Sequence, residues 1–410
     1  MSNIFKNFNN PFVALKNRNF RLYWIAWSIS LIGTWMQNIA QPWLAYSLTG
    51  SAFLLSLVGA LQFTPILLFS LFAGVLVDRF PKKNIILITQ SCSVIVTMVP
   101  AILIWTDKIR YWHILVLATA LGLINAVDMP ARQTFVTELV GKKNTMNAVA
   151  LNSALFNTAR IIGPALAGLI MGYTSIAFCF FLNSLSFLAT IIGLLFVKPT
   201  FKPEIKIKSI DVFANIKDGL LYTFNNKTLF KTVVTVAIVA TFAMNFSVLI
   251  PVFTKIILKG KETGFGFLMS WMGIGSLCGA LGVATTSKSG PHHFNLNITP
   301  WLIAGMLIVT GFTNSFFAAA ITIFLTGFFF ALFSSSSNSN IQINSSDQYR
   351  GRAMSVYTLV FSGSTPIGNL YAGFFSDHFG PRAGFYACGI AIFLLTALFY
   401  LLKGNRKNVW

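Results

Sequence analysis

Three charged side chains lie well inside stretches that are otherwise apolar: Asp128, Arg132 and Arg160. Asp128 and Arg132 are four residues apart and therefore share one face of a helix. A charge in hydrocarbon costs at least about 2.5 kcal/mol on insertion scales, so each of the three must face protein or water. The Asp128 carboxylate beside the guanidinium of Arg132 or Arg160 can take up a proton when the pair opens, and it can equally form a permanent salt bridge between helices. The sequence therefore predicts a proton-coupling or gating group, with a permanent ion pair as the alternative.

The segments that carry these charges are typical of a membrane protein. Of the 410 residues, 55% are hydrophobic and 10% are charged, and the mean hydropathy is +0.71. A soluble globule does not cover its surface with so few charges. A transmembrane helix needs about 20 mostly apolar residues, and twelve such stretches can be placed, of which Ile298 to Gly311 is the weakest. We expect an all-α membrane protein with twelve transmembrane helices.

Lysine and arginine are distributed unevenly along the chain. The net charge is +20, and 22 of the 30 basic residues fall in the termini and every second connection, against six in the other connections. Cytoplasmic segments carry such an excess. The pattern predicts a multi-pass protein of the cell membrane, surrounded by lipid, with both termini cytoplasmic. Nucleic acid is not expected as a partner, because no basic stripe with stacking aromatic residues stands outside the apolar stretches.

A polar segment divides the chain into two halves. Residues 198–229 contain prolines, many lysines and apolar residues from Ile210 to Leu221 whose spacing gives one apolar face to a short helix, which predicts a cytoplasmic linker with a short amphipathic helix. Residues 1–197 and 230–410 then form two pseudo-symmetric six-helix bundles. Two glycines of the first half recur 205 residues later, each after the same residue type: Gly163 and Gly168 as Gly368 and Gly373.

A charged cluster stands between the second and third apolar stretches. Gly74, Asp78, Arg79 and Lys83 lie where a helix meets water, so the charges can stay solvated or pair with neighbouring helix ends. We expect this turn to act as a conformational latch between helices that move. Gly163, Pro164 and Gly168 form a second motif in the fifth stretch, where small residues and a proline permit either a hinge or close packing.

These two motifs resemble those of the major facilitator superfamily, and the resemblance covers essentially the whole chain. The cluster from Gly74 to Lys83 corresponds to the family signature between helices two and three, and Gly163 to Gly168 resembles the Gly-Pro motif of antiporters. Within the superfamily, three stretches resemble the branch that contains the enterobactin exporter and macrolide efflux proteins: Asn125 to Gln133, Leu151 to Pro164 and Arg350 to Ser355. The resemblance implies secondary transport by alternating access, and it favours export.

Polar side chains within the apolar stretches are candidates for a substrate cavity. In the first stretch they recur at helical spacing, and others stand in the fourth, fifth and seventh: Thr34, Trp35, Asn38, Gln41, Asn125, Asn152, Asn157 and Asn245. The alternative is that they form interhelical hydrogen bonds or, for Trp35, that the ring packs in the protein. The run Ser334 to Asn340 favours close helix packing, with an aqueous vestibule as the alternative.

Several functional classes are not expected. The sequence has no Walker motif, HExxH or GxSxG, so neither an enzyme nor an ATP-driven pump is predicted. The four cysteines stand in separate apolar stretches, which predicts no disulfide, metal site or cofactor. We expect a monomeric, proton-coupled exporter of a neutral or anionic, moderately apolar small molecule, such as a macrolide-like drug or a siderophore. The alternatives are a proton-coupled importer of a nutrient and a non-transporting membrane partner protein.

Overall fold

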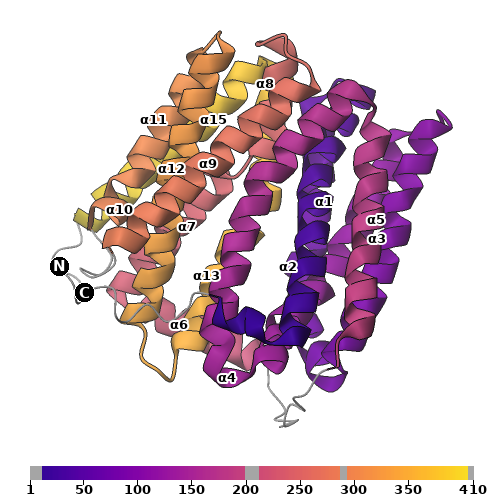
Figure 1. The fold of residues 1–410 in the computed structure, drawn as a ribbon. Coiled ribbons are helices and arrows are strands. Elements are labelled where there is room, and N and C mark those ends of the chain that lie inside the picture. The colour runs from indigo at the N-terminus through magenta and orange to yellow at the C-terminus, as the bar shows by residue number, and fades with distance from the viewer. Residues whose placement is uncertain (1–11, 199–211, 287–292, 405–410) are drawn as a thin grey trace, which may run out of the picture.

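The computed structural model describes residues 12–198, 212–286 and 293–404, and a few side chains within these ranges, including that of Asp78, lie outside the description. The described residues are helical apart from short connections. Figure 1 shows the helices of the first half gathered on the right of the view and those of the second half on the left. This arrangement agrees with the expected all-α class.

The first half is built from six elements: η1 (Val13–Lys16), α1 (Arg18–Thr49), α2 (Ala52–Arg79), α3 (Lys82–Trp105), α4 (Tyr111–Tyr173) and α5 (Ile176–Phe196). The 63-residue α4 is two helices joined at Gly141, whose φ of 70° and ψ of 165° are not helical. Only glycine adopts this backbone conformation readily. The chain therefore reverses direction at Gly141 without a loop.

A short helix and the second half follow: α6 (Val212–Asn225), α7 (Lys227–Ala243), α8 (Phe246–Ile256), α9 (Glu262–Thr286), α10 (His293–Asn297), α11 (Thr299–Phe312), α12 (Phe316–Asn344), α13 (Arg350–Gly363), α14 (Thr365–Phe379) and α15 (Pro381–Gly404). Helices α7 and α8 continue one another across a break at Met244 and Asn245. Helices α13 and α14 do the same across Ser364, which precedes the Thr365-Pro366 start of α14.

Eight stretches in the described residues are long and apolar enough to cross a membrane. They include all of α4 as one stretch and α7 with α8 as another, whereas α11 has 14 residues and is shorter than a typical span. The count of twelve transmembrane helices and the domain boundaries at 197 and 230 stay predictions.

Each half is packed mainly within itself. In the first half, α1 contacts α4 and α5, and α2 contacts α4; in the second, α9 contacts α12, and α11 contacts α15. The halves meet where α4 packs on α9 and α2 packs on α14. We call the end where α1 begins and α2 ends the basic end, and the end where α1 ends and α9 begins the opposite end. The basic end lies toward the bottom of Figure 1, where α6 is also found.

The linker helix α6 is attached to the second half. Asp218 accepts a hydrogen bond from Arg352 at 3.2 Å, and the ring of Tyr222 stacks on that of Tyr349 with centroids 4.5 Å apart. A Cβ on Gly219 would lie 3.0 Å from the carbonyl oxygen of Arg352. A helix is therefore present within the expected linker and lies against the start of α13, whereas its amphipathic role stays a prediction.

Candidate functional site

Asp128 and Arg132 form a buried ion pair one turn apart on α4. The Arg132 Nε lies 2.5 Å from Asp128 Oδ2, and the two residues are 9% and 7% exposed. Such short charge-assisted hydrogen bonds are stronger than neutral ones. The i, i+4 spacing in the sequence predicts this geometry, and the structure has it.

Neutral side chains from two other helices complete the coordination of the pair. On α3, Thr89 Oγ1 donates to Asp128 Oδ1 at 2.6 Å, and Gln90 Nε2 donates to the same oxygen at 3.2 Å. On α1, the Tyr23 hydroxyl accepts from Arg132 Nη1 at 3.2 Å. The ion pair therefore ties α1, α3 and α4 together, and sequence reasoning identified none of these three partners.

Aromatic rings enclose the guanidinium side of the pair. The Arg132 Cζ lies 5.7 Å from the centroid of the Trp27 ring, within the range of a cation–π contact. The Tyr23 ring stacks on Trp27 at 6.0 Å and meets Phe135 edge to face at 5.3 Å. We name Tyr23, Asp128, Arg132 and Phe135 the first-half cluster. A proton could neutralise the Asp128 carboxylate of this cluster. The Arg132 guanidinium would then still contact its aromatic neighbours.

Arg160 lies apart from the described partners of Asp128. The residue is on the part of α4 beyond Gly141, and its carbonyl oxygen lies 3.0 Å from a Cβ built on Gly273 of α9. Its Nε is buried and has no hydrogen-bond partner among the described residues. Of the two arginines suggested by the sequence, Arg132 is therefore the one that pairs with Asp128. Arg160 instead places a buried donor at the contact between the halves.

The charged cluster between α2 and α3 is bound in part to the first half. Lys83 Nζ donates to the carbonyl oxygen of Val197 at the end of α5, 2.8 Å away, which is a favourable place for a cation. Arg79 is exposed, and a Cβ built on Gly74 would meet no atom within 4 Å. The side chain of Asp78 lies outside the described residues. The latch function stays a prediction.

Lys82, which the sequence analysis did not single out, is the buried member of this turn. It is 6% exposed, and its Nζ lies 3.8 Å from Glu138 Oε1 of α4. The Glu138 carboxylate is the sequence signal for a buried Lys82, but Lys82 and Glu138 are 56 positions apart in the sequence. Their contact depends on how α3 packs against α4.

The helix-five motif packs on both sides. A Cβ on Gly163 would lie 2.4 Å from the Trp35 Cβ of α1, and one on Gly168 would lie 3.1 Å from the Gly266 Cα of α9. The carbonyl oxygen of Pro164 lies 2.4 Å from a Cβ built on Gly266. Close backbone contact between α4 and α9 therefore requires small residues here, as the packing alternative predicts.

Three described hydrogen bonds join the two halves, from the opposite end to the middle of the helices. They are Trp43 Nε1 to Glu262 Oε1 at 3.1 Å, the Ala52 N–H to Asp377 Oδ1 at 2.7 Å and Ser270 Oγ to the Ile161 carbonyl oxygen at 2.8 Å. The Trp43 ring also stacks on Phe265, with centroids 5.8 Å apart. The opposite end of the molecule is closed by these contacts.

The candidate cavity residues divide into two groups. Six of them are half-buried, and their place at a cavity stays a prediction: Thr34, Trp35, Asn38, Asn125, Asn152 and Asn157. The Asn152 Oδ1 is buried without a hydrogen-bond partner among the described residues, whereas Asn157 Nδ2 donates to its own helix at Ser153. Trp35 meets Phe156 edge to face at 5.4 Å, so packing accounts for part of its surroundings.

Gln41 and Asn245 differ from the expectation of a central cavity. Asn245 is 0% exposed at the break between α7 and α8, where its Nδ2 donates to the Thr241 carbonyl oxygen at 2.9 Å. Gln41 is 6% exposed and donates to Gln62 Oε1 at 3.0 Å. Both side chains are buried within their own half in this conformation, Gln41 through a hydrogen bond to α2 and Asn245 through one to its own chain segment, with its Oδ1 left without a partner among the described residues.

Gln41 belongs to a chain of amides that sequence reasoning missed. Asn183 Nδ2 of α5 donates to Gln37 Oε1 at 2.6 Å, and Gln37 Nε2 contacts Gln41 Oε1 at 3.5 Å before Gln41 reaches Gln62 on α2. The chain links three helices inside the first half. The signal was present as amides in three separate apolar stretches, but their proximity depends on tertiary packing.

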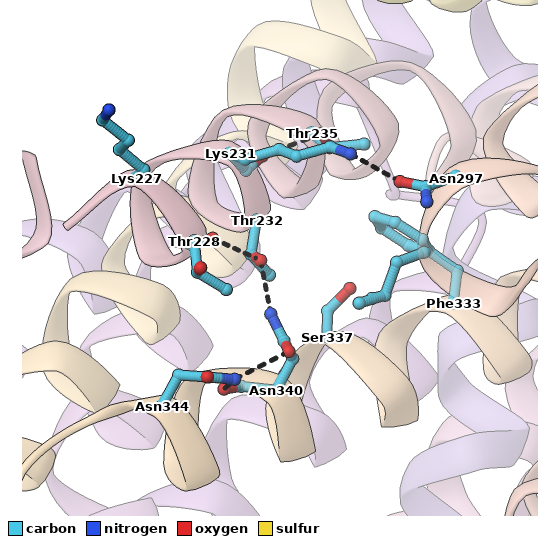
Figure 2. A pocket seen from close by; sticks show the side chains of 11 residues that line it. Lys227, Thr228, Lys231, Thr232, Thr235, Asn297, Phe333, Ser337, Asn340 and Asn344 are labelled. Atoms are coloured by element: carbon cyan, nitrogen blue, oxygen red, sulfur yellow. Dashed lines mark hydrogen bonds between the residues drawn. The ribbon is translucent and has the colours of Figure 1, made fainter. Parts of the chain in front are cut away.

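A polar pocket of about 450 Å³ lies inside the second half near the basic end. Figure 2 shows it between α7, which contributes Lys227, Lys231 and Thr232, and α12, which contributes Ser337 and Asn340. Part of the run Ser334 to Asn340 therefore lines a pocket, while Ser336 accepts a hydrogen bond from Asn295 at 3.0 Å. The run therefore contributes both to a pocket and to a contact with α10, and the choice between close packing and a vestibule stays a prediction.

Comparison with known proteins extends over the whole chain. Residues 9–408 match a family model described as transmembrane secretion effector. The staphyloferrin A transporter of Staphylococcus aureus is 28% identical, covering 92% of this chain and 94% of its own. The multidrug efflux pump Tap of Mycolicibacterium fortuitum is 26% identical, covering 92% and 93%. Macrolide efflux protein A of Streptococcus pyogenes is 20% identical, covering 95% and 96%.

Among solved structures, a bacterial homologue of the human lysosomal transporter Spinster, in an inward-facing and unoccupied conformation, superimposes with a TM-score of 0.79. The match covers 96% of this chain and 97% of that one at 11% sequence identity. At that identity the likeness establishes the fold alone.

Proposed function

The chain belongs to the major facilitator superfamily, in the family of transmembrane secretion effectors, and on this premise we propose that it exports a small molecule in exchange for protons. It is a multi-pass membrane transporter and not an enzyme, with efflux pumps and a siderophore transporter among its relatives. The resemblance predicted from the two glycine motifs and the branch-like stretches is confirmed. Direction, coupling ion and substrate class belong to the proposal.

The buried Asp128–Arg132 pair carries the coupling part of the proposal. Asp128 lies on α4, 17 positions after its first residue Tyr111, and its carboxylate is held by Arg132, Thr89 and Gln90. Protonation would neutralise the carboxylate and leave Arg132 with Tyr23 and Trp27 as neighbours. Because the three helices α1, α3 and α4 meet at this point, a change of charge there would alter the packing of the first half.

The closure of the opposite end supports alternating access. The hydrogen bonds from Trp43 to Glu262 and from Ala52 to Asp377 join the halves at that end. If the basic end faces the cytoplasm, as the distribution of lysine and arginine predicts, this conformation is closed to the outside. In the proposed cycle the substrate enters from the cytoplasm, and proton uptake by Asp128 accompanies the return of the protein to this state.

The charges inside the protein favour a neutral or anionic substrate. Arg160 presents a buried Nε without a described partner at the contact between the halves. Asp128 is already bound to Arg132, so it offers little to a cation. A moderately apolar molecule with a carboxylate or another acceptor group, such as a siderophore or a macrolide-like drug, fits this balance better than a dicationic one.

The test is proton flux in proteoliposomes of the purified protein. The lumenal pH is followed with a trapped dye under an imposed pH gradient while a catecholate siderophore, a macrolide and a dicationic dye are added in turn. We expect substrate-dependent proton movement with one of the first two. The matched variants are Asp128→Asn and Asp107→Asn, because Asp107 is exposed in the connection before α4 and has a φ of 54° that asparagine also tolerates. Flux should be lost in the first variant and kept in the second.

A double variant separates coupling from a structural ion pair. Asp128→Asn leaves Arg132 without its carboxylate, so a misfolded single variant would be ambiguous. Asp128→Asn with Arg132→Gln removes both charges together. If this double variant is folded and still moves protons with substrate at the wild-type rate, Asp128 is not the proton carrier. Proton flux on addition of the dicationic dye, and with neither of the other two molecules, would contradict the proposed substrate class.

A further inference from the structure

The pocket in the second half occupies the place that the first-half cluster fills in the other half. The structure establishes this equivalence through two landmarks. Asn17 and Asn226 are both N-caps, and each accepts hydrogen bonds from the backbone N–H groups two and three residues later, at the starts of α1 and α7. A Cβ on Gly122 of α4 would lie 2.3 Å from the Gln62 carbonyl oxygen, and one on Gly327 of α12 would lie 2.4 Å from that of Met272. Both landmarks mark the same structural position in each half.

These landmarks fix which residues correspond. From Asn17 to Asn226 the offset is 209, so Tyr23 of α1 corresponds to Thr232 of α7. From Gly122 to Gly327 the offset is 205, so Phe135 and Arg132 of α4 correspond to Asn340 and Ser337 of α12.

The contacts between the corresponding residues agree with the assignment. Tyr23 meets Phe135 edge to face at 5.3 Å, whereas Asn340 Nδ2 donates to Thr232 Oγ1 at 2.8 Å. The second half has three short polar side chains in place of two aromatic rings and a long guanidinium, while at the same offset of 205 the ring of Phe333 stands in place of the Asp128 carboxylate. The three polar side chains line the 450 Å³ pocket, which is within the size range of small-molecule sites.

The floor of the pocket is buried and the mouth is exposed. Phe333, Ser337 and Asn340 are buried on α12, and Lys227, Thr228 and Asn344 are exposed. Since α7 begins at Lys227 and α12 ends at Asn344, the exposed residues lie at the basic end. A ligand would therefore enter from the basic end.

One polar group on the floor lacks a partner. The Ser337 side chain is 0% exposed and lines the pocket, and its Oγ makes no hydrogen bond with the described residues. Figure 2 shows the hydroxyl beside Asn340 without a dashed line to a neighbour. A buried hydroxyl without a hydrogen bond is unfavourable by about 1 to 3 kcal/mol, so a ligand atom or water is expected to satisfy it.

Two lysines contribute to the lining. Lys227 and Lys231 contribute two ammonium groups, and the described lining residues include no carboxylate. Lys231 Nζ donates to Asn297 Oδ1 at 2.7 Å and lies 4.8 Å from the centroid of the Tyr400 ring, which holds the ammonium at the pocket wall. Hydroxyl and amide groups from Thr232, Asn340 and Ser337 supply neutral hydrogen-bonding partners on the other side.

We propose that this pocket is a binding site for an oxyanion, a carboxylate or phosphate group that enters from the basic end. The lysines would neutralise the charge, and Ser337 Oγ would donate to one of its oxygens. The group can belong to a soluble organic acid or phosphate, or to the headgroup of an anionic lipid. The inference does not depend on the direction or coupling of transport.

The test measures binding, so its failure differs from a failure of the transport proposal. Purified protein in nanodiscs of zwitterionic lipid is titrated with citrate and with inorganic phosphate by calorimetry, and choline serves as the cationic probe. A parallel sample uses nanodiscs that contain phosphatidylglycerol. We expect citrate or phosphate to bind in zwitterionic nanodiscs if the source is soluble. If the source is lipid, phosphatidylglycerol should raise the melting temperature and suppress binding of the soluble anions.

Three variants report on the pocket itself. Ser337→Ala and Lys231→Gln should each weaken anion binding, or remove the effect of phosphatidylglycerol, by about tenfold. Thr232→Tyr with Asn340→Phe restores the residue types of the first half and should abolish binding by filling the space. The matched controls are Ser335→Ala, which is half-buried on the same helix but does not line the pocket, and Lys261→Gln, which is exposed at the opposite end.

Each outcome of this test either supports the proposed site or overturns it. Anion binding that falls in Ser337→Ala and Lys231→Gln and is kept in both controls supports the site. The proposal is overturned if neither citrate, phosphate nor phosphatidylglycerol has an effect, if choline binds instead, or if the pocket variants and the controls lose affinity equally. Ser337→Ala removes a single oxygen, so it keeps the test valid even if the double variant does not fold.

Discussion

The indole nitrogen of Trp43 donates a hydrogen bond to the carboxylate of Glu262, and this contact joins the end of α1 to the start of α9 at 3.1 Å. The Trp43 ring also stacks on Phe265, and the Lys255 ammonium lies 5.9 Å from its centroid. One side chain of the first half therefore holds a donor contact and an aromatic contact to the second half. These contacts are part of the closed opposite end.

Trp43→Phe should weaken closure of the opposite end. The ring and its stacking remain, but the hydrogen bond to a charged group is lost, at a cost of about 1 to 2 kcal/mol because Glu262 is half-buried. That corresponds to about a five- to thirtyfold shift in the equilibrium between conformations. Spin labels at Leu48 and Lys261, in a protein without its native cysteines, would show a larger fraction of molecules in which the two labels are far apart. Trp105→Phe, whose ring packs within the first half, should leave the distances unchanged.

Gly266→Ala should prevent the close contact between α4 and α9. The new methyl group would lie 2.4 Å from the Pro164 carbonyl oxygen and 2.7 Å from the Gly168 Cα, and these backbone atoms cannot rotate away. We expect the closed opposite end to be lost and transport to fall at least tenfold in the proteoliposome assay. The control is Gly305→Ala in α11, where a Cβ meets no atom within 4 Å. Wild-type transport by Gly266→Ala would mean that this contact is not needed in the cycle.

Gly141→Ala should destabilise the first half. With a φ of 70° and ψ of 165°, this backbone is essentially accessible to glycine alone, and an L side chain there is expected to cost about 1 to 3 kcal/mol. The measurement is the melting temperature in detergent, compared with Gly351→Ala near the start of α13, where a Cβ also meets open space. An unchanged melting temperature for Gly141→Ala would show that the chain can reverse there in another way.

Tyr23→Phe should expose the dependence of the ion pair on its neutral partners. The ring contacts with Trp27 and Phe135 are kept, but Arg132 Nη1 loses the hydroxyl that accepts its hydrogen bond at 3.2 Å. An unsatisfied buried donor is expected to lower stability by about 1 to 3 kcal/mol. Thermal unfolding measures this loss, and Tyr173→Phe, at a residue that is 85% exposed, is the control. Equal melting temperatures for both variants would show that water replaces the hydroxyl.

Local spacing predicts the parts of the site that lie on one turn of one helix. Asp128 and Arg132 form their pair because residues four apart face the same side of α4. The position of Arg160 relative to Asp128 was not predictable in this way, because the chain reverses at Gly141 and the helices on either side pack against different neighbours.

The faces of the polar helices were harder to predict than their existence. Gln41 recurs at helical spacing with Thr34 and Asn38, yet it turns to Gln62 within the first half. Hydrophobic periodicity does not distinguish a cavity from a polar contact between helices, since both interrupt an apolar surface. The distinction depends on which neighbour supplies the hydrogen-bonding partner, and this information is not local in the sequence.

The breaks at Asn245 and Ser364 make the two halves mechanically unequal. Gly368 lies just beyond the break at Ser364 and close to the break at Asn245. A Cβ built on Gly368 would lie 1.8 Å from the Thr241 carbonyl oxygen and 2.7 Å from Asn245 Oδ1. Two interruptions of helical hydrogen bonding thus lie against each other in the second half, whereas the corresponding Gly163 packs against the unbroken α1. When the halves rock against each other, bending should be concentrated in the second half, and the first should turn as a stiff body.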